Sequence, residues 1–243
     1  MVSKSQIKLI NSLKQKKYRK QHNLFVAEGI KTITELINSD IELYQLFTTE
    51  PFNSDAKSEI LITENELKKI SFLKTPNQAL ALFKVPSSQT VTSNGLILVL
   101  DDVQDPGNLG TIIRLCDWFG IENLICSPNT VDCYNPKVIQ ATMGSISRVN
   151  LSYMELEQFI KRNKLPIYGA FMNGTNVYTS KLHKQGILIM GNEANGISEE
   201  LEKLIQHRIA IPRFGAQQET ESLNVATATA ILLSEFRRGF TGK

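Results

Sequence analysis

Two kinds of apolar pattern alternate along this chain, and their alternation predicts a mixed α/β fold. Short runs rich in Leu, Ile and Val are typical of buried strands, whereas apolar residues three or four positions apart are typical of amphipathic helices. In the first part of the chain these patterns predict strands at 24–29, 44–49 and 79–85 and helices at about 4–17, 31–39 and 64–71.

The alternation becomes more regular after residue 95. The patterns predict strands at 95–103, 123–127, 148–153, 166–171, 186–193 and 207–212, and helices at 110–120, 136–147, 155–163, 198–206 and 221–238. Repeated strand–helix units are typical of a parallel sheet with helices on both faces. The polar stretch VPSSQTVTSNG at 85–95 indicates a linker. We therefore expect a small α/β domain over residues 1–90 and a parallel α/β domain over residues 91–243.

The basic residues of the chain are unevenly distributed. The formal net charge is +3, but residues 1–90 hold 13 Lys and Arg against 9 Asp and Glu. Seven basic residues precede the first acid, Glu28; they are Lys4, Lys8, Lys14, Lys16, Lys17, Arg19 and Lys20. Such an arm suits a polyanion, because phosphate contacts release condensed counterions. On charge alone, a solvated helix face is the simpler interpretation.

Nothing in the sequence indicates export or insertion into a membrane. No apolar run has the length of a bilayer span, and the first twenty residues lack the apolar core and cleavage site of a secretory signal. The three cysteines, Cys116, Cys126 and Cys133, lack metal or redox spacing and predict reduced thiols in a cytoplasmic protein. The three histidines are scattered, so we expect no metal site.

Candidate chemistry gathers in three polar segments, each directly after a predicted strand. They are DDVQDPGNLGTIIR (101–114), GNEANG (191–196) and IPRFGAQQETESLN (211–224). In open α/β sheets, ligands bind at the carboxyl ends of strands. Neither the dinucleotide fingerprint GxGxxG nor the phosphate loop GxxxxGK[ST] is present, which argues against a nucleotide-binding oxidoreductase on the same kind of sheet.

The three segments resemble, in order, the signature motifs of the SpoU/TrmH family of RNA ribose 2′-O-methyltransferases, which belong to the SPOUT class. The matching residues are Asn108, Gly110 and Arg114 in the first motif, Gly191, Asn192, Glu193 and Gly196 in the second, and Ile211, Pro212, Ser222, Leu223, Asn224 and Val225 in the third. The resemblance covers nearly the whole C-terminal half. It implies S-adenosylmethionine as cofactor, a deep trefoil knot in the α/β domain, and a homodimer with sites near its interface.

The N-terminal half is similar to the family in another way. KKYRKQHNLFVAEGIKTITELI (16–37) resembles the opening of members that carry an extra RNA-binding domain, similar to a ribosomal protein and associated more often with ribosomal RNA than with tRNA. The resemblance therefore predicts RNA contacts by Lys14, Lys16, Lys17, Arg19 and Lys20. It implies methylation of a ribose 2′-hydroxyl, most simply in 23S ribosomal RNA; the alternatives are a tRNA methyltransferase and an inactive RNA-binding or assembly protein of the same fold.

The resemblance also assigns roles to the motif residues. It implies that Arg114 lies beside the target ribose and assists loss of the 2′-hydroxyl proton. A guanidinium group stays protonated in proteins, so Arg114 is a poor literal base. It can instead bind the adjacent phosphate through two of its N–H groups and stabilise the negative charge that develops on the ribose 2′-oxygen. The structural alternative is an ion pair with Asp117 or Asp105. Asn108 is expected to cap the following helix, to orient Arg114 or the RNA, or both.

The remaining motif residues divide between substrate and cofactor. Glu193 is expected to position Arg114 or the RNA, with an ordinary surface carboxylate as the alternative. Ser222 and Asn224 either cap the last helix or reach the substrate. Cofactor binding is implied, largely through backbone groups and apolar walls, for Gly191, Asn192, Gly196, Ile211, Pro212 and Leu223.

Two positions depart from the family pattern. Arg213 follows Ile211 and Pro212 where an apolar residue, often Met, is more usual, and Gln140 stands where many relatives have Arg. Both lie outside the central motif residues, and both are expected to alter contacts with RNA.

Overall fold

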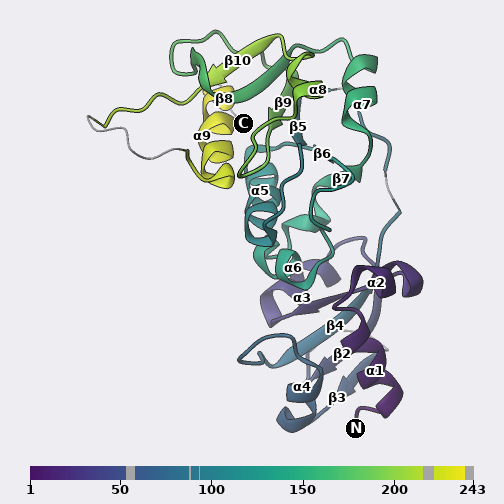
Figure 1. The fold of residues 1–243 in the computed structure, drawn as a ribbon. Helices are drawn as coiled ribbons and strands as arrows, with labels where there is room; N and C mark the ends of the chain where they lie inside the picture. The colour runs from purple at the N-terminus through teal and green to yellow at the C-terminus, as the bar shows by residue number, and fades with distance from the viewer. Residues whose placement is uncertain (53–57, 88, 93, 216–221, 239–243) are drawn as a thin grey trace. The chain divides into compact units, whose positions relative to one another are not determined.

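The computed structural model of the protein describes residues 1–52, 58–87, 89–92, 94–215 and 222–238, which divide into two units (Figure 1). The first unit comprises residues 1–87 together with 132–147, and the second comprises residues 88–131 and 148–243. The expected division at residue 90 placed residues 132–147 with the C-terminal part. Their contacts group them instead with the N-terminal residues, so the chain passes between the two units three times.

The first unit contains a four-stranded mixed sheet in the order β1-β4-β2-β3. β4 pairs antiparallel with both β1 and β2, and β2 pairs parallel with β3. The strands are β1 (Leu24–Glu28), β2 (Leu43–Thr48), β3 (Glu59–Leu61) and β4 (Ala79–Lys84). Three of them confirm the predicted strands. The sequence patterns missed β3, because three residues are too few to show an alternating pattern.

Short helices surround this sheet. They are α1 (Lys4–Ser12), α2 (Lys16–His22), α3 (Ile30–Ile37), α4 (Glu64–Ile70) and α6 (Pro136–Thr142), followed by a 3₁₀ turn, η1 (Ser145–Ser147). One core cluster brings together Ile10 and Leu13 of the N-terminal segment, Leu67 of α4, and Leu80 and Leu82 of β4. The helix predicted over 136–147 ends at Thr142 because Met143 and Gly144 adopt positive φ angles.

The helix predicted over residues 4–17 is broken in two, and Arg19 explains the break. Leu13 is fully buried, and Gln15 is extended ahead of α2. Nη1 of Arg19 donates to the carbonyl oxygens of Leu13 and Lys14, at 2.7 and 2.9 Å. The carbonyl groups at the break are thus bonded by a side chain instead of by a continuing helix.

The second unit is built on a six-stranded sheet in which every pairing is parallel, in the order β10-β8-β9-β5-β6-β7. Its strands are β5 (Leu96–Leu100), β6 (Asn123–Cys126), β7 (Asn150–Tyr153), β8 (Ile167–Asn176), β9 (Gly186–Met190) and β10 (His207–Ala210). The predicted parallel sheet is confirmed. β8 continues five residues beyond the predicted strand, and its register with β10 shifts between Arg208 and Ile209.

The helices of this unit are α5 (Pro106–Phe119), α7 (Leu156–Arg162), α8 (Glu199–Glu202) and α9 (Val225–Arg237). Leu156, Ile160 and Leu201 pack α7 and α8 on the face of the sheet that presents Ile97 and Ile187. α5 and α9 pack against each other, and Figure 1 shows them side by side across the sheet from α7. Within the described part of the chain, no helix is both long and apolar enough to cross a membrane.

Candidate active site

Three strands of the parallel sheet end in the loops that carry the sequence motifs. β5, β9 and β10 run in the same direction, so their carboxyl ends meet at one edge of the sheet. The loops begin at Asp101, Gly191 and Ile211. The order of the strands therefore gathers segments that lie far apart in the sequence.

Asn192 organises the turn after β9 with both ends of its amide. Its Oδ1 accepts the backbone N–H groups of Ala194 and Asn195, at 2.9 and 3.0 Å. Its Nδ2 donates to the carbonyl oxygen of Asp102, 2.6 Å away in the loop after β5. Asn192 thus shapes its own turn and ties it to the neighbouring strand end.

Gly191 is required by the close approach of two backbone segments. A Cβ atom at this position would overlap the backbone of Gly196 and Ile197. The backbones of Asn192 and Gly196 also exchange two hydrogen bonds, at 2.9 and 3.0 Å, with Gly196 at a φ of +71°. Only a residue without a side chain fits at position 191 without displacing the turn.

One residue from each motif joins a chain of side-chain hydrogen bonds. Asn224 donates from Nδ2 to Oδ1 of Asn108, at 2.8 Å. Asn108 in turn donates from its own Nδ2 to Oε1 of Glu193, at 3.0 Å. The amide of Asn108 is thereby fixed in orientation, and the three motifs are linked in the order third, first, second.

Glu193 receives further donors from the loop after β5. The backbone N–H groups of Gln104 and Asp105 donate to its two carboxylate oxygens, each at 3.1 Å. Partial desolvation raises the pKa of Glu193, but hydrogen bonds from Asn108, Gln104, its own backbone N–H and Asp105 outweigh that effect, so the pKa lies below the ordinary carboxyl value. The carboxylate is an anionic acceptor built into the edge of the site.

The two helices that flank the site begin with side-chain caps. Asp105 caps α5 by accepting the backbone N–H of Asn108 at 2.8 Å, and Pro106 occupies the first helical position. The expectation that Asn108 caps this helix is therefore wrong, since Asn108 lies inside it. Asn224 caps α9 through Oδ1 while its Nδ2 reaches Asn108. Asn224 therefore caps the last helix and also takes part in the hydrogen-bonded chain of the site.

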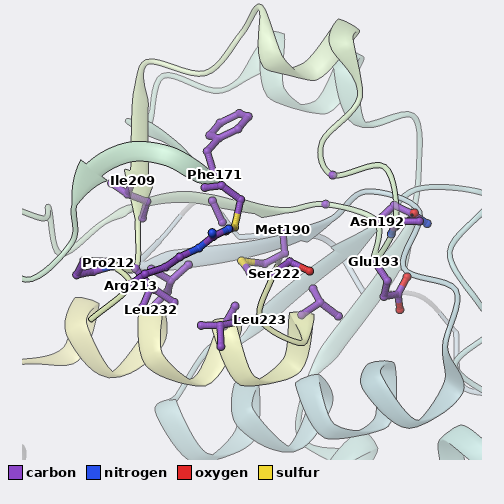
Figure 2. A pocket seen from close by; sticks show the side chains of 18 of the residues that line it. Phe171, Met190, Asn192, Glu193, Ile209, Pro212, Arg213, Ser222, Leu223 and Leu232 are labelled. Carbon is purple, nitrogen blue, oxygen red and sulfur yellow. Dashed lines mark hydrogen bonds between the residues drawn. The ribbon is translucent and has the colours of Figure 1, made fainter. Parts of the chain in front are cut away.

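A cavity of about 1240 Å³ opens between the turn after β9, the segment after β10 and the start of α9 (Figure 2). All six residues expected to bind cofactor line it: Gly191, Asn192, Gly196, Ile211, Pro212 and Leu223. Glu193 and Ser222 line it as well. Its walls are otherwise mostly apolar, which suits a nucleoside with a few polar groups.

Part of the cavity wall comes from residues that the sequence motifs did not assign to the cofactor; of these, only Arg213 was singled out in the sequence, as a residue expected to alter contacts with RNA. Phe171 and Met172 lie in β8, Met190 ends β9, and Arg213 and Phe214 follow Pro212. No motif marks the β8 residues, so only the fold could reveal them. Among the described residues, no group of three His, Cys, Asp or Glu side chains could hold a metal ion.

Arg114 lies on the exposed face of α5 and does not line the cavity of its own chain. The alternative predicted for it, an ion pair with Asp117 or Asp105, is wrong. Asp117 accepts from Nε of Arg148, at 3.0 and 3.1 Å, and Asp105 caps the helix. No described residue forms a hydrogen bond or ion pair with Arg114, which leaves its guanidinium directed to the surface of the unit.

The predicted RNA-binding residues of the first unit fall into two classes. The side chains of Lys14, Lys16, Lys17 and Lys20 are exposed on and beside α2. Arg19, by contrast, is only 3% exposed; it donates from Nε and Nη2 to Oδ2 of Asp132, at 3.0 and 2.5 Å. The prediction of an RNA contact by Arg19 is corrected on this ground, because its guanidinium is already used within the unit.

Comparison with known sequences identifies both parts of the chain. The sequence profile of the SpoU rRNA Methylase family matches residues 95–234, which include all three motifs and all six strands of the parallel sheet. The chain belongs to the SpoU rRNA methylase family. A second profile, that of the MRM3-like substrate binding domain, matches residues 4–81. The family match spans residues 132–147 although they pack with the first unit.

Individual relatives and solved structures resemble the chain along nearly its whole length. It is 29% identical over 234 residues to the 23S rRNA (guanosine(2553)-2′-O)-methyltransferase RlmP of Bacillus subtilis, covering 93% of each chain. A protein of the TrmH family from Porphyromonas gingivalis has the same fold, with a TM-score of 0.88 and 37% identity over 98% of this chain and 99% of that one. The AdoMet-bound rRNA methyltransferase from Sinorhizobium meliloti gives a TM-score of 0.87 and 27% identity over 100% and 98%.

The cavity of this SpoU family member has the features that S-adenosylmethionine requires. Ile211, Leu223 and Met190 provide apolar surface for the adenosine, and the glycine at 196 leaves backbone accessible, with no atom within 4 Å of where its Cβ would stand. Charged side chains, Glu193 and Arg213, lie at two places on the wall. These residues fit an amphipathic, zwitterionic nucleoside.

Proposed function

We propose that this protein methylates a ribose 2′-hydroxyl of 23S ribosomal RNA, with S-adenosylmethionine as methyl donor. The observation that carries the proposal is the hydrogen-bonded chain of Glu193, Asn108 and Asn224, which joins all three family motifs beside the cavity. The choice of ribosomal RNA is supported by the MRM3-like match at residues 4–81 and by the 23S rRNA methyltransferase RlmP as a full-length relative.

The bound donor would supply a methyl group on a positively charged sulfur, which transfers without further activation once a nucleophilic oxygen is in line. The residues of this chain then have positional and electrostatic tasks. Glu193 holds Asn108, Asn108 in turn holds Asn224 at the start of α9, and Glu193 and Ser222 line the cavity. Arg114 binds phosphate in a fork and stabilises the negative charge that develops on the ribose oxygen as its proton leaves.

Arg114 performs this task across a homodimer in our proposal. Its side chain is exposed and does not line the cavity of its own chain. One turn further along α5, Trp118 is 83% exposed, an unusual position for a large aromatic side chain on a monomer surface. If two copies of the chain associated through α5 about a two-fold axis, Trp118 would be buried in the interface and Arg114 would lie beside the cavity of the partner.

Two finer features of the resemblance complete the proposal. We include the deep trefoil knot, for which the match to the SpoU family and the looped segments around the cavity are the support. We also include a cytoplasmic location, because ribosomal RNA is the substrate and the three cysteines are free thiols. The exposed lysines beside α2 would contact the phosphate backbone of the RNA.

The test is methyl transfer from tritium-labelled S-adenosylmethionine to three RNA samples: 23S rRNA, 16S rRNA and tRNA, each from cells that lack the protein. We expect label in 23S rRNA alone. The labelled nucleotide should be followed by a phosphodiester bond that resists alkaline hydrolysis, because its 2′-hydroxyl is methylated. Label confined to tRNA would replace the proposed substrate. RNA binding without any transfer would favour an RNA-binding or assembly protein of the same fold.

The homodimer can be tested separately by mixing two inactive variants, Arg114→Ala and Gly191→Ala. If each site combines Arg114 of one copy with the cavity of the other, mixed dimers contain one intact site and recover activity. Independent sites within single chains would give no recovery, since every chain would remain defective.

A further inference from the structure

The segment between β9 and α8, residues 191–198, is held in place by the two residues that follow β5. At its start, Asn192 donates from Nδ2 to the carbonyl oxygen of Asp102, at 2.6 Å. At its end, the backbone N–H of Ser198 donates to Oδ2 of Asp101, at 2.7 Å. Asp101 acts through its buried side chain, whereas Asp102 acts through its backbone. The segment that carries the cavity-lining turn is therefore fixed at both ends by neighbouring residues.

Asp102 has a backbone conformation that most residues avoid. Its φ angle is +58°, in the left-handed region, which is disfavoured for residues other than glycine and tolerated best by Asn and Asp. Among the described residues, Asn23, Gln78 and Met143 also have positive φ angles without being glycine, and all three belong to the first unit. Because a carbonyl group turns with the backbone of its own residue, this conformation sets where Asp102 presents the oxygen that accepts from Asn192.

The loop after β6 holds Asp102 in this conformation, although that loop carries none of the three motifs. Ser127 is 5% exposed; its Oγ accepts the backbone N–H of Asp102 at 2.9 Å and donates to Oδ1 of the same residue. Asn129 donates from Nδ2 to Oδ2 of Asp102, at 3.3 Å. The carbonyl oxygen of Asn129 also accepts Nε2 of Gln104, at 2.8 Å, and the backbone N–H of Gln104 donates to Glu193. The loop after β6 is thus connected by hydrogen bonds to the loop that holds the turn.

A disfavoured backbone conformation that persists because side chains hold it is a sign of a functional constraint. We infer that Asp102 and Ser127 are positioning residues for cofactor binding. Ser127 secures the left-handed conformation of Asp102, and Asp102 places the turn after β9 against the cofactor. Neither residue lines the cavity, so both act through Asn192 and its neighbours. The inference rests on the proposed use of S-adenosylmethionine and adds the residues that set the shape of its binding turn.

The test compares two substitutions that remove the same side chain. Asp102→Ala and Asp102→Gly both lose the carboxylate, but glycine adopts positive φ angles freely whereas alanine does not. Ser127→Ala, which removes two hydrogen bonds to Asp102, is a second variant. Asn23→Ala is the matched control, because Asn23 has a φ of +53° at the end of α2 and does not line the cavity. Calorimetry measures the affinity for S-adenosylmethionine, and thermal unfolding identifies the temperatures at which each variant is folded.

We expect Asp102→Ala to bind S-adenosylmethionine about tenfold more weakly than the wild type, because the free variant relaxes out of the left-handed region and binding must restore it. Asp102→Gly should bind within about threefold of the wild type, since glycine keeps the conformation available. Ser127→Ala should weaken binding in the same direction as Asp102→Ala. A role in folding alone would lower the unfolding temperature and leave the affinity of the folded protein unchanged, which is the result expected for Asn23→Ala.

Three outcomes would overturn the inference while leaving the proposed function intact. The first is equal affinity of Asp102→Ala and Asp102→Gly, and the second is wild-type affinity in Ser127→Ala. The third is an equal loss of affinity in Asn23→Ala, because strain at a position outside the second unit would then have the same effect. Failure of the wild type to bind S-adenosylmethionine would instead remove the proposed cofactor, and the inference with it.

Discussion

Asn108 and Glu193 are joined by a hydrogen bond of 3.0 Å between Nδ2 and Oε1, although 85 residues separate them in the sequence. The bond fixes the amide of Asn108 so that its Oδ1 faces Asn224. The asparagine therefore connects α5, in which it lies, with the turn after β9 and with the start of α9. Its side chain transmits the position of Glu193 to the helix start that closes the cavity.

Replacing Asn108 by Asp should disrupt this connection more than replacing it by Leu. Both variants lose the donor to Glu193, but Asp also places a second carboxylate against it, and like charges at this distance repel. We expect Asn108→Asp to lower the free energy of unfolding by about 1 kcal/mol more than Asn108→Leu near neutral pH. Urea unfolding of the two variants measures the difference, and equal stability would show that the contact is not formed.

The stability of the protein should also depend on the ionisation of Glu193. Its pKa is lowered in the folded state from an ordinary value of 4.5. A carboxylate whose pKa is lowered on folding stabilises the folded state at any pH above its pKa in the unfolded chain. That contribution is lost as the pH falls below 4.5 and through the pKa of the folded state. Unfolding experiments from about pH 6 to pH 3 should show a smaller loss of stability for Glu193→Gln than for the wild type. Parallel curves would contradict the role of these hydrogen bonds.

Gly191→Ala should damage the site through the backbone. The added methyl group would overlap Gly196 and Ile197, so the turn must move and carry Asn192 and Glu193 with it. We expect a loss of about 1–3 kcal/mol in unfolding free energy and a marked loss of cofactor affinity. Gly215→Ala is the matched control, since it lines the same cavity but would meet no atom within 4 Å. Equal behaviour of the two variants would refute the close approach.

Much of this arrangement could be predicted from the sequence because its signals are local. Runs such as LILVL and GILIM indicate buried strands, and parallel strands bring their ends to one edge. The sequence also contains the signal for the cap on α5. Asp105 directly precedes Pro106, which is a common pairing at the start of a helix, whereas Asn108 lies too far inside the helix to cap it.

Other features depend on contacts that no local pattern encodes. Arg19 resembles its lysine neighbours in sequence, but its partner Asp132 is 113 residues away. The wall contributed by Phe171 and Met172 depends on how far β8 extends and where its register with β10 shifts. These properties follow from tertiary packing, which places residues of ordinary type in special surroundings.

Arg114→Lys should separate catalysis from cofactor binding. Lysine keeps the charge but lacks the planar fork, and Arg114 does not line the cavity of its own chain. We expect methyl transfer to fall by about 100-fold or more, the scale for losing a stabiliser of developing charge, with the cofactor dissociation constant unchanged. Arg162→Lys, at an exposed site outside the cavity, is the control. Full activity of Arg114→Lys would exclude a role for the fork.

The exposed lysines beside α2 should set the salt dependence of RNA binding. We expect the combined substitution of Lys14, Lys16, Lys17 and Lys20 by Gln to weaken binding and to reduce the slope of log affinity against log salt by up to about 3, because each lost phosphate contact removes released counterions. Lys68→Gln with Lys69→Gln, on α4 of the same unit, is the comparison. Filter binding over a range of salt concentrations gives both slopes.

Arg19 provides the sharpest contrast within the same segment. It is buried, bonds two carbonyl oxygens at the break between α1 and α2, and pairs with Asp132. Removing one partner of a buried pair leaves an uncompensated charge, so Arg19→Met should lower the free energy of unfolding by about 3–5 kcal/mol. At a temperature where the variant stays folded, its salt slope for RNA should equal that of the wild type. A stable Arg19→Met protein with a reduced slope would return Arg19 to the RNA-binding surface.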